Sequence, residues 1–359
     1  MPAAPFAPPA ETGADPGSRI VLELAPTPAV PRNSEGAFAT LRDGRILYTY
    51  TQYYGGDEDH SAARLAEITS SDGGRTWSEP RVVVAGVDGR GLNVMSLSLL
   101  RLASGRLARF HLLTRSPVDC RPWLSYSADD GATWTEPRLL LPDPGYYVLN
   151  NDRVIQTRTG RLVMPMNVHA RAWARGEAVW FYSDDEGATW TASPSRWSLA
   201  EGNAGLQESG VVETPGGALL SWFRTDRGCQ YESRSTDDGA TWSAPQPGGL
   251  ASPLSPASIK RRPGTNELVA VFNDHSGRFP FVAGMRTPLA LAVSADDGAT
   301  WPARRLLEAD TRRWYHYAAL HFTADALLLA YNAGDDIMGK FRSPLRLRRV
   351  ELAWLPRPA

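Results

Sequence analysis

The sequence is short of three features that would point to particular classes of protein. It has two cysteines in 359 residues, and its 38 basic and 39 acidic side chains leave a formal net charge of −1. It also has no apolar run close to the roughly 18–20 residues that a membrane-spanning helix needs. A disulfide framework is therefore excluded, and neither a nucleic acid nor a membrane is expected as a partner, because balanced charge gives no bulk attraction to phosphate or anionic lipid.

The two cysteines and the start of the chain carry little further signal. Cys120 and Cys229 lie far apart, so we expect two free, partly buried thiols. Residues 1–18 are rich in Ala, Pro and Gly and lack the basic start and apolar segment of a signal peptide. We expect a disordered leader there, followed by one domain over 19–359 and, by default, a cytoplasmic location unless a signal has been removed.

Glycine, proline and tryptophan are plentiful, as is typical of a turn-rich β protein. One pattern, Ser-x-Asp-x-Gly-x-Thr-Trp, recurs with its tryptophans 52 to 59 residues apart. The copies of this octad begin at Ser70, Ser127, Ser183, Ser235 and Ser294. The aspartate is expected to accept hydrogen bonds within its own turn, the glycine to adopt positive φ, and the tryptophan to pack between units. These aspartates are therefore interpreted as structural.

A fainter pattern, a turn followed by an apolar strand, recurs between the octads. Its six copies span residues 41–47, 102–107, 157–163, 214–220, 262–268 and 323–329. Six four-stranded units of about 55–60 residues predict an all-β fold, a six-bladed β-propeller. The sixth unit has no octad, and its last strand candidates are residues 19–24 and 345–354. Pairing these two ends would close the ring and remove exposed edges.

Propeller geometry limits where a site can lie, because the inner-strand starts and the loops between second and third strands share one rim. The predicted starts are residues 32–35, 93–96, 150–152, 207–208, 255–258 and 315–317. The predicted loops are 55–60, 116–119, 167–171, 224–227 and 273–275, and the last of these continues to 285–288. This rim is rich in arginine, carboxylate, tyrosine and histidine, which favours a polar binding site.

The five octads resemble the Asp-box of sialidases, also called the bacterial neuraminidase repeat, over roughly residues 19–356. The resemblance implies an exo-α-sialidase-like glycoside hydrolase that releases terminal sialic or related acidic sugars from glycans, with no cofactor or metal. In the sialidase pattern three arginines hold the substrate carboxylate. The matching residues are Arg32, Arg224 and Arg286.

The resemblance also implies the catalytic residues. They are Asp59 as acid/base, Glu208 as the base and Tyr317 as the nucleophile, with Asp57 competing with Asp59 and Tyr315 with Tyr317. The further candidates for substrate binding on the rim are Glu35, Asp57, His60, Asn151 and His169.

These roles suit the chemistry of an acidic sugar. A sialic acid carries a carboxylate on its anomeric carbon, which guanidinium groups hold through charge-assisted hydrogen bonds. The same carboxylate would repel an anionic nucleophile, whereas a tyrosine is neutral and needs only a neighbouring base.

The sequence departs from the sialidase pattern in three places. Arg-Ile-Pro is replaced by Arg32-Asn-Ser-Glu35, which brings an extra carboxylate, and Tyr-Ser is replaced by Tyr317-Ala. The rim histidines His60, His169 and His275 are also outside the general pattern. A divergent branch is expected, and the sugar stays open.

Two other functions are therefore considered beside that of a sialidase. One is a glycosidase or lyase acting on another ulosonic or uronic acid, and the lyase requires a histidine against the tyrosine hydroxyl. The other is a sugar-binding propeller without catalysis, in which Asp59 or Tyr317 points away from the arginines. The linkage, the glycan carrier and the oligomeric state cannot be predicted.

Overall fold

The computed structural model describes residues 15–86, 92–335 and 343–358. Most of the expected leader, residues 1–14, lies outside this part, and Ser18 already begins the first strand. The described residues form 25 strands and one short 3-10 helix, η1 (Leu352–Trp354). No helix in these ranges is long and apolar enough to cross a membrane. The chain is all-β, as the sequence predicted.

Three of the sheets are four-stranded and keep their strands in chain order. The first contains β2 (Arg32–Thr40), β3 (Ile46–Tyr53), β4 (Ala63–Ser70) and β5 (Arg81–Val84). The second contains β15 (Gln207–Glu213), β16 (Leu219–Arg224), β17 (Cys229–Ser235) and β18 (Gln246–Ala251). The third contains β19 (Ser258–Arg261), β20 (Leu268–Asn273), β21 (Leu289–Ser294) and β22 (Ala303–Glu308).

A fourth four-stranded sheet joins the two ends of the chain. Its strands, in spatial order, are β1 (Ser18–Leu24), β25 (Leu345–Glu351), β24 (Ala326–Asp335) and β23 (Arg313–Phe322). β1 runs antiparallel to β25, from the pair Ser18 and Val350 to the pair Leu24 and Leu345. The two segments that the sequence offered as partners therefore pair, and β1 covers an edge that β25 would otherwise expose.

The remaining strands form one nine-stranded sheet. Its first part contains β6 (Asn93–Arg101), β7 (Leu107–Ser116), β8 (Asp119–Ser127) and β9 (Arg138–Leu139). Its second part contains β11 (Ile155–Gln156), β12 (Leu162–His169), β13 (Gly176–Ser183) and β14 (Thr191–Trp197). Between them, β10 (Tyr146–Val148) pairs parallel with β8 and antiparallel with β12. The sequence predicted six separate units, whereas β10 merges two of them into one hydrogen-bonded sheet.

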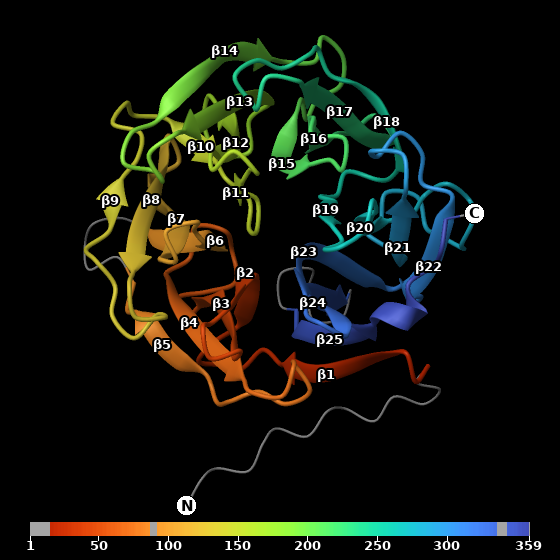
Figure 1. The fold of residues 1–359 in the computed structure, drawn as a ribbon, viewed down its shortest axis with the longest axis horizontal. Helices are drawn as coiled ribbons and strands as arrows, with labels where there is room; N and C mark the ends of the chain where they lie inside the picture. The colour runs from red at the N-terminus through yellow and green to blue at the C-terminus, as the bar shows by residue number, and fades with distance from the viewer. Residues whose placement is uncertain (1–14, 87–91, 336–342, 359) are drawn as a thin grey trace, which may run out of the picture.

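Figure 1 shows the sheets set in chain order around a common centre, with β2, β6, β15, β19 and β23 nearest to it and β5, β9, β14, β18 and β22 at the periphery. The core lies between neighbouring sheets, and strands such as β3, β20 and β21 are buried at every position because both of their faces are covered. Trp180 of β13 stacks on Trp242 of the fourth octad, with ring centroids 4.7 Å apart. The tryptophan of that octad thus packs between units, as predicted.

The octads close the turns that follow β4, β8, β13, β17 and β21, the third strand of each unit that contains an octad. In the second copy, Asp129 accepts hydrogen bonds from the Ser127 hydroxyl, the Thr133 amide and the Thr133 hydroxyl, at 2.8, 2.9 and 2.6 Å. The glycine of the same copy, Gly131, has a φ of 86°, which a residue with a Cβ adopts only with strain. The predicted turn chemistry is therefore present.

Candidate functional site

A pocket of about 740 Å³ lies among the inner-strand starts. Seven of the residues singled out from the sequence line it. They are Glu35, Asp59, His169, Glu208, Arg224, Arg286 and Tyr317. These residues come from segments far apart in the chain, so the pocket exists only because the sheets surround one centre.

Four inner strands carry a β-bulge at this pocket. The register shifts in β2, β6, β15 and β23 each contain one residue with positive φ. These residues are Glu35 (49°), Ser96 (50°), Glu208 (47°) and Tyr317 (57°). Positive φ is uncommon and costly for a non-glycine residue, and a bulge turns a side chain out of the strand's alternation. All four residues line the pocket, so the strained backbone conformations occur at residues whose side chains face the pocket.

Tyr317 and Glu208 form the centre of the pocket's polar network. The Tyr317 hydroxyl donates to Glu208 Oε1 at 3.0 Å, and Arg224 Nη1 lies 2.8 Å from the same oxygen. Burial favours the neutral form of Glu208, but the Arg224 and Arg286 guanidinium groups lower its pKa overall. Burial, and then the charge of Glu208, raise the pKa of Tyr317 far above its usual value. A neutral phenol therefore faces an ionised carboxylate.

Arg224 and Arg286 present cationic groups next to this pair. The Arg286 guanidinium carbon lies 5.9 Å from the ring centroids of both Tyr317 and Trp314. Within the described residues, Nε of each of these two arginines and Oε2 of Glu208 are buried without a hydrogen-bonding partner. Both arginines line the pocket, and a guanidinium group at a cavity can bind an anionic or strongly accepting ligand.

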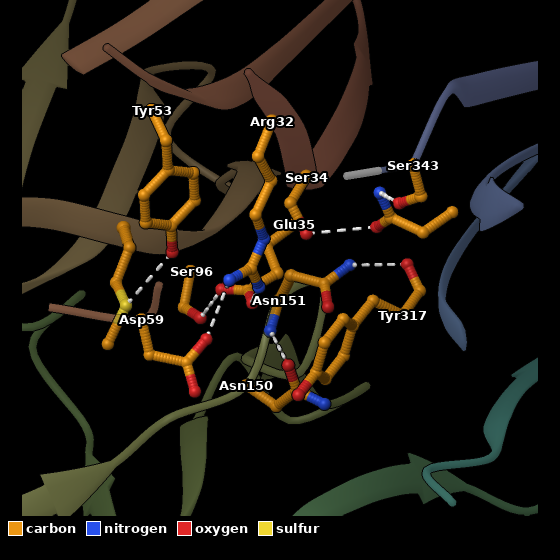
Figure 2. A network of polar contacts seen from close by, with 12 residues as sticks. Arg32, Ser34, Glu35, Tyr53, Asp59, Ser96, Asn150, Asn151, Tyr317 and Ser343 are labelled. Carbon is orange, nitrogen blue, oxygen red and sulfur yellow. Dashed lines mark hydrogen bonds and ion pairs between the residues drawn. The ribbon is translucent and has the colours of Figure 1, made fainter. Parts of the chain in front are cut away.

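Arg32 is arranged differently from these two arginines. It is 1% exposed and is not among the residues that line the pocket. Its Nη1 donates to Asp59 Oδ1 at 2.7 Å and to the Asp57 carbonyl at 3.2 Å, and its Nη2 lies 3.2 Å from Glu35 Oε1. Figure 2 shows the guanidinium between the two carboxylates. The sequence suggested three arginines open to a ligand, whereas the structure pairs Arg32 with two acidic side chains.

The two carboxyl groups on Arg32 titrate in opposite directions. Burial raises the pKa of Glu35 to about 7, against the attraction of Arg32 and the hydroxyl of Ser96, which donates to Glu35 Oε2. Burial also acts on Asp59, but the ion pair with Arg32 and a hydrogen bond with Trp173 lower its pKa overall. Near neutral pH, Asp59 is therefore ionised while Glu35 is close to its midpoint.

Asn151 supports the site from behind instead of lining the pocket. It is buried, and its Nδ2 donates to the carbonyl oxygens of Gly36 and Tyr317 at 3.0 and 3.3 Å. One amide therefore ties the bulge of β2 to the bulge of β23. Its place in the structure is that of a positioning residue.

The two predicted histidines belong to an aromatic wall. His60 Nε2 lies 3.1 Å from the Tyr146 hydroxyl, and its ring lies 4.7 Å from Trp173. His169 Nδ1 lies 2.6 Å from the Ala174 carbonyl, and its ring meets Tyr146 edge-on. Burial lowers the pKa of both histidines. Within the described ranges, no group of three His, Cys, Asp or Glu side chains is placed to hold a metal ion.

Three other residues named from the sequence lie off the pocket lining. Asp57 meets Arg32 through its backbone carbonyl, as given above. Tyr315 is fully buried in an apolar cluster with Tyr331. His275 stacks on Phe281 with ring centroids 4.4 Å apart. The structure thus separates Asp59 from Asp57, and Tyr317 from Tyr315.

Sequence reasoning missed several residues that line the pocket. They include Ser96, Trp173, Trp314 and His316. Ser96 and His316 lie within predicted inner-strand starts, and Trp314 directly precedes one, so position alone could have selected them. Trp173 lies two residues beyond a predicted loop, and it is 70% exposed with a φ of 58°. An exposed tryptophan at a strained position was the signal available only from the structure.

Comparison with known proteins agrees with this architecture. The model of the BNR repeat-like domain matches residues 44–330, most of the chain. The chain belongs to this family, within the sialidase superfamily. The family model lies within the span over which the octads resemble the sialidase repeat.

Individual relatives are distant. A sialidase of Micromonospora viridifaciens is 26% identical over 358 positions, covering 89% of this chain and 51% of the relative. The intramolecular trans-sialidase of Ruminococcus gnavus superimposes with a TM-score of 0.73 at 16% identity, covering 97% of this chain and all of that one. The Trypanosoma rangeli sialidase gives 0.72 at 18%, covering 94% and 60%. The chain spans about half the length of the curated sialidase from Micromonospora, and the structural likeness establishes the fold.

Proposed function

We propose that the protein is an exo-sialidase-type glycoside hydrolase that releases a terminal sialic or related acidic sugar from glycans with retention of configuration. The observation that carries this proposal is the 3.0 Å hydrogen bond from the Tyr317 hydroxyl to Glu208, whose carboxylate also binds Arg224. A neutral phenol with an ionised carboxylate against its hydroxyl is a nucleophile with its base in place.

The cationic groups support an acidic substrate. Arg224 and Arg286 line the pocket next to the Tyr317–Glu208 pair. A carboxylate on the anomeric carbon would bind these guanidinium groups and would bring that carbon next to the tyrosine oxygen. The same negative charge disfavours a carboxylate nucleophile, which is why a tyrosine suits this substrate class.

The proposed reaction has two balanced halves. In the first, the Tyr317 oxygen forms a bond to the anomeric carbon while Glu208 takes the phenolic proton. The bond to the leaving oxygen breaks, and Asp59 donates a proton to that oxygen. In the second, water attacks the anomeric carbon and gives a proton to Asp59, while Tyr317 leaves and recovers its proton from Glu208.

The ionised state of Asp59 in the free protein sets a requirement for the first half of the reaction. The ion pair with Arg32 favours the ionised form of Asp59, which suits the base of the second half. To act as the acid, Asp59 must take up a proton after the substrate has bound and before the bond to the leaving oxygen breaks.

The geometry disfavours the competing readings. A lyase would need a histidine against the tyrosine hydroxyl, and the acceptor of that hydroxyl is Glu208. A lectin would leave Asp59 or Tyr317 turned away from the arginines, and these side chains contact Arg32 and Arg286. Tyr315 is packed in the core, which favours Tyr317 as the nucleophile.

The proposal includes the architecture predicted from the repeats. The nine-stranded sheet then counts as two blades joined by β10, and residues 19–359 form one six-bladed catalytic domain. The pairing of β1 with β25 supports a ring in which the two ends share a blade.

A fluorinated sialic acid tests the proposal, because fluorine next to the anomeric centre slows breakdown of the covalent intermediate. Digestion and mass analysis should find the adduct on Tyr317, and Tyr317→Phe should carry none. A fluorogenic sialoside, run beside related acidic glycosides, reports which sugar is released. Labelling of a carboxylate, or no turnover of any acidic glycoside, would contradict the proposal.

A further inference from the structure

The site holds one more buried carboxylate than the proposed chemistry uses. Asp59 and Glu208 have roles in the reaction, whereas Glu35 lines the pocket and binds Arg32 without one. If all three carboxylates are ionised, they balance the three arginines of the site. An anionic ligand would then add an uncompensated negative charge to a largely buried place, which is unfavourable.

We propose that Glu35 determines the charge selectivity of the pocket. The acidic sugar binds while Glu35 is protonated, so one proton enters the site together with the sugar. The carboxylate of the sugar is held by Arg224 and Arg286. Arg32 then holds Glu35 and Asp59 in place. This inference rests on the proposed function, and it explains how the pocket can bind an anionic ligand without an excess of negative charge.

The backbone fixes Glu35 at the pocket. It sits in the bulge of β2 with a φ of 49°, and Gly36 follows it. A Cβ on residue 36 would collide with the Tyr48 hydroxyl and the Thr49 carbonyl, so the chain needs glycine there. The carboxyl group cannot easily swing away, because it is 5% exposed and bound by Arg32 and Ser96.

The contacts of Glu35 fit both of its protonation states. Oε1 faces the Arg32 guanidinium, which can only donate, while Oε2 faces the Ser96 hydroxyl. A hydroxyl donates to a carboxylate and accepts from a carboxylic acid after a simple rotation. The proton therefore has a defined place, on Oε2, and its arrival requires no rearrangement of the backbone.

Near neutral pH, Glu35 changes its charge, whereas the ionisable groups that face it keep theirs. Arg32 stays cationic, and the pKa values of Asp59 and Glu208 are lowered, so both stay ionised. The other neighbours are phenols and one thiol whose pKa values burial raises, so they stay neutral. They are Tyr48, Tyr53, Cys120, Tyr146 and Tyr317. Burial raises the pKa of Glu35 itself to about 7.

The direction of the pH effect follows from these charges. Below about pH 7, Glu35 is neutral and the three arginines exceed the two remaining carboxylates by one charge, which an anion cancels. Above it, each binding event must first restore the proton. Affinity for an anionic ligand should then fall about tenfold per pH unit.

Calorimetry with 2,3-unsaturated sialic acid, which is ionised at every pH used, tests this inference. From pH 6 to 9 the dissociation constant of the wild-type protein should rise about tenfold per unit above pH 7. Glu35→Gln, a neutral isostere, should keep the pH 6 affinity throughout. The matched control is Glu58→Gln, which removes an exposed carboxylate from the same pocket and should keep the wild-type slope.

A second measurement needs no variant that could fail to fold. Binding enthalpies of the wild-type protein in two buffers of different ionisation enthalpy give the protons taken up, and about half to one proton per ligand is expected near pH 7.5. No uptake, or a slope that persists in Glu35→Gln and disappears in Asp59→Asn, would overturn this inference and leave the proposed function standing. Absence of binding at every pH would overturn both.

Discussion

Acidic side chains serve different purposes in the octads and in the pocket of this protein. In an octad, Asp129 finds all of its hydrogen-bonding partners within four residues of itself and is exposed to solvent. In the pocket, Glu208 finds Tyr317 109 residues away and meets Arg224 on the neighbouring strand. The comparison teaches that an acidic side chain whose hydrogen bonds are all formed within its own turn has a structural role. An acidic side chain held by distant partners around a cavity is available for chemistry.

The largest effect is expected when a single oxygen atom, the hydroxyl of Tyr317, is removed from the pocket. Tyr317→Phe removes only the hydroxyl, so the ring should stay packed against Arg286 and the acidic sugar should still bind. Because the nucleophile is lost, hydrolysis of a fluorogenic sialoside should fall about a thousandfold or more. An unchanged melting temperature is the control, and full activity would show that this oxygen is not the nucleophile.

Removal of the acid/base should give a smaller effect that depends on the leaving group. Asp59→Ala should lower turnover of a natural glycoside by about 10²–10⁴-fold, because its leaving oxygen needs a proton. An aryl glycoside with a good leaving group needs little protonation and should lose much less in the first half of the reaction. Equal losses for both substrates would argue against the role of Asp59 as acid.

The octad side of the comparison predicts a stability effect without a catalytic one. Asp237 accepts from the Ser235 hydroxyl and from the amide and hydroxyl of Thr241. Asp237→Ala leaves these donors without their partner and should lower the free energy of unfolding by about 1–2 kcal/mol. Asp143→Ala, in an exposed loop, serves as the control in denaturant titration. Loss of turnover by the folded variant would mean that the octad has a role in the site.

The smallest expected effect is in the acid response of the octads. Hydrogen bonds from Thr133, and then from Ser127, lower the pKa of Asp129 to about 2, and those of Thr189 and Ser183 outweigh burial to give Asp185 the same value. A lowered pKa stabilises the fold above the unfolded value of about 4, and this contribution disappears as the pH falls towards 2. Thermal melts between pH 5 and 2 should therefore show a decline that is shallower in Asp129→Asn.

Part of the site could be predicted because it follows the repeat. The fainter repeat marks the turn after each inner strand, and this places Glu208 and Tyr317 at inner-strand starts on one rim. The partners could not be predicted in the same way. Arg32 was expected to face a ligand, but it lies between Glu35 and Asp59, because a bulge in β2 and a loop after β3 converge on it. No local pattern encodes that convergence.

The sequence by itself determined the turns and the strand content, because both depend on residues close together or on simple alternation. It also predicted the pairing of the two ends, because that pairing leaves fewer exposed strand edges. Only the tertiary structure decided that β10 joins two units, that positive φ aims Glu35, Ser96, Glu208 and Tyr317, and that Glu35 and Asp59 share one arginine. The physical reason is that burial and long-range charge set protonation and strain. Neither exists until distant strands have been brought around one centre.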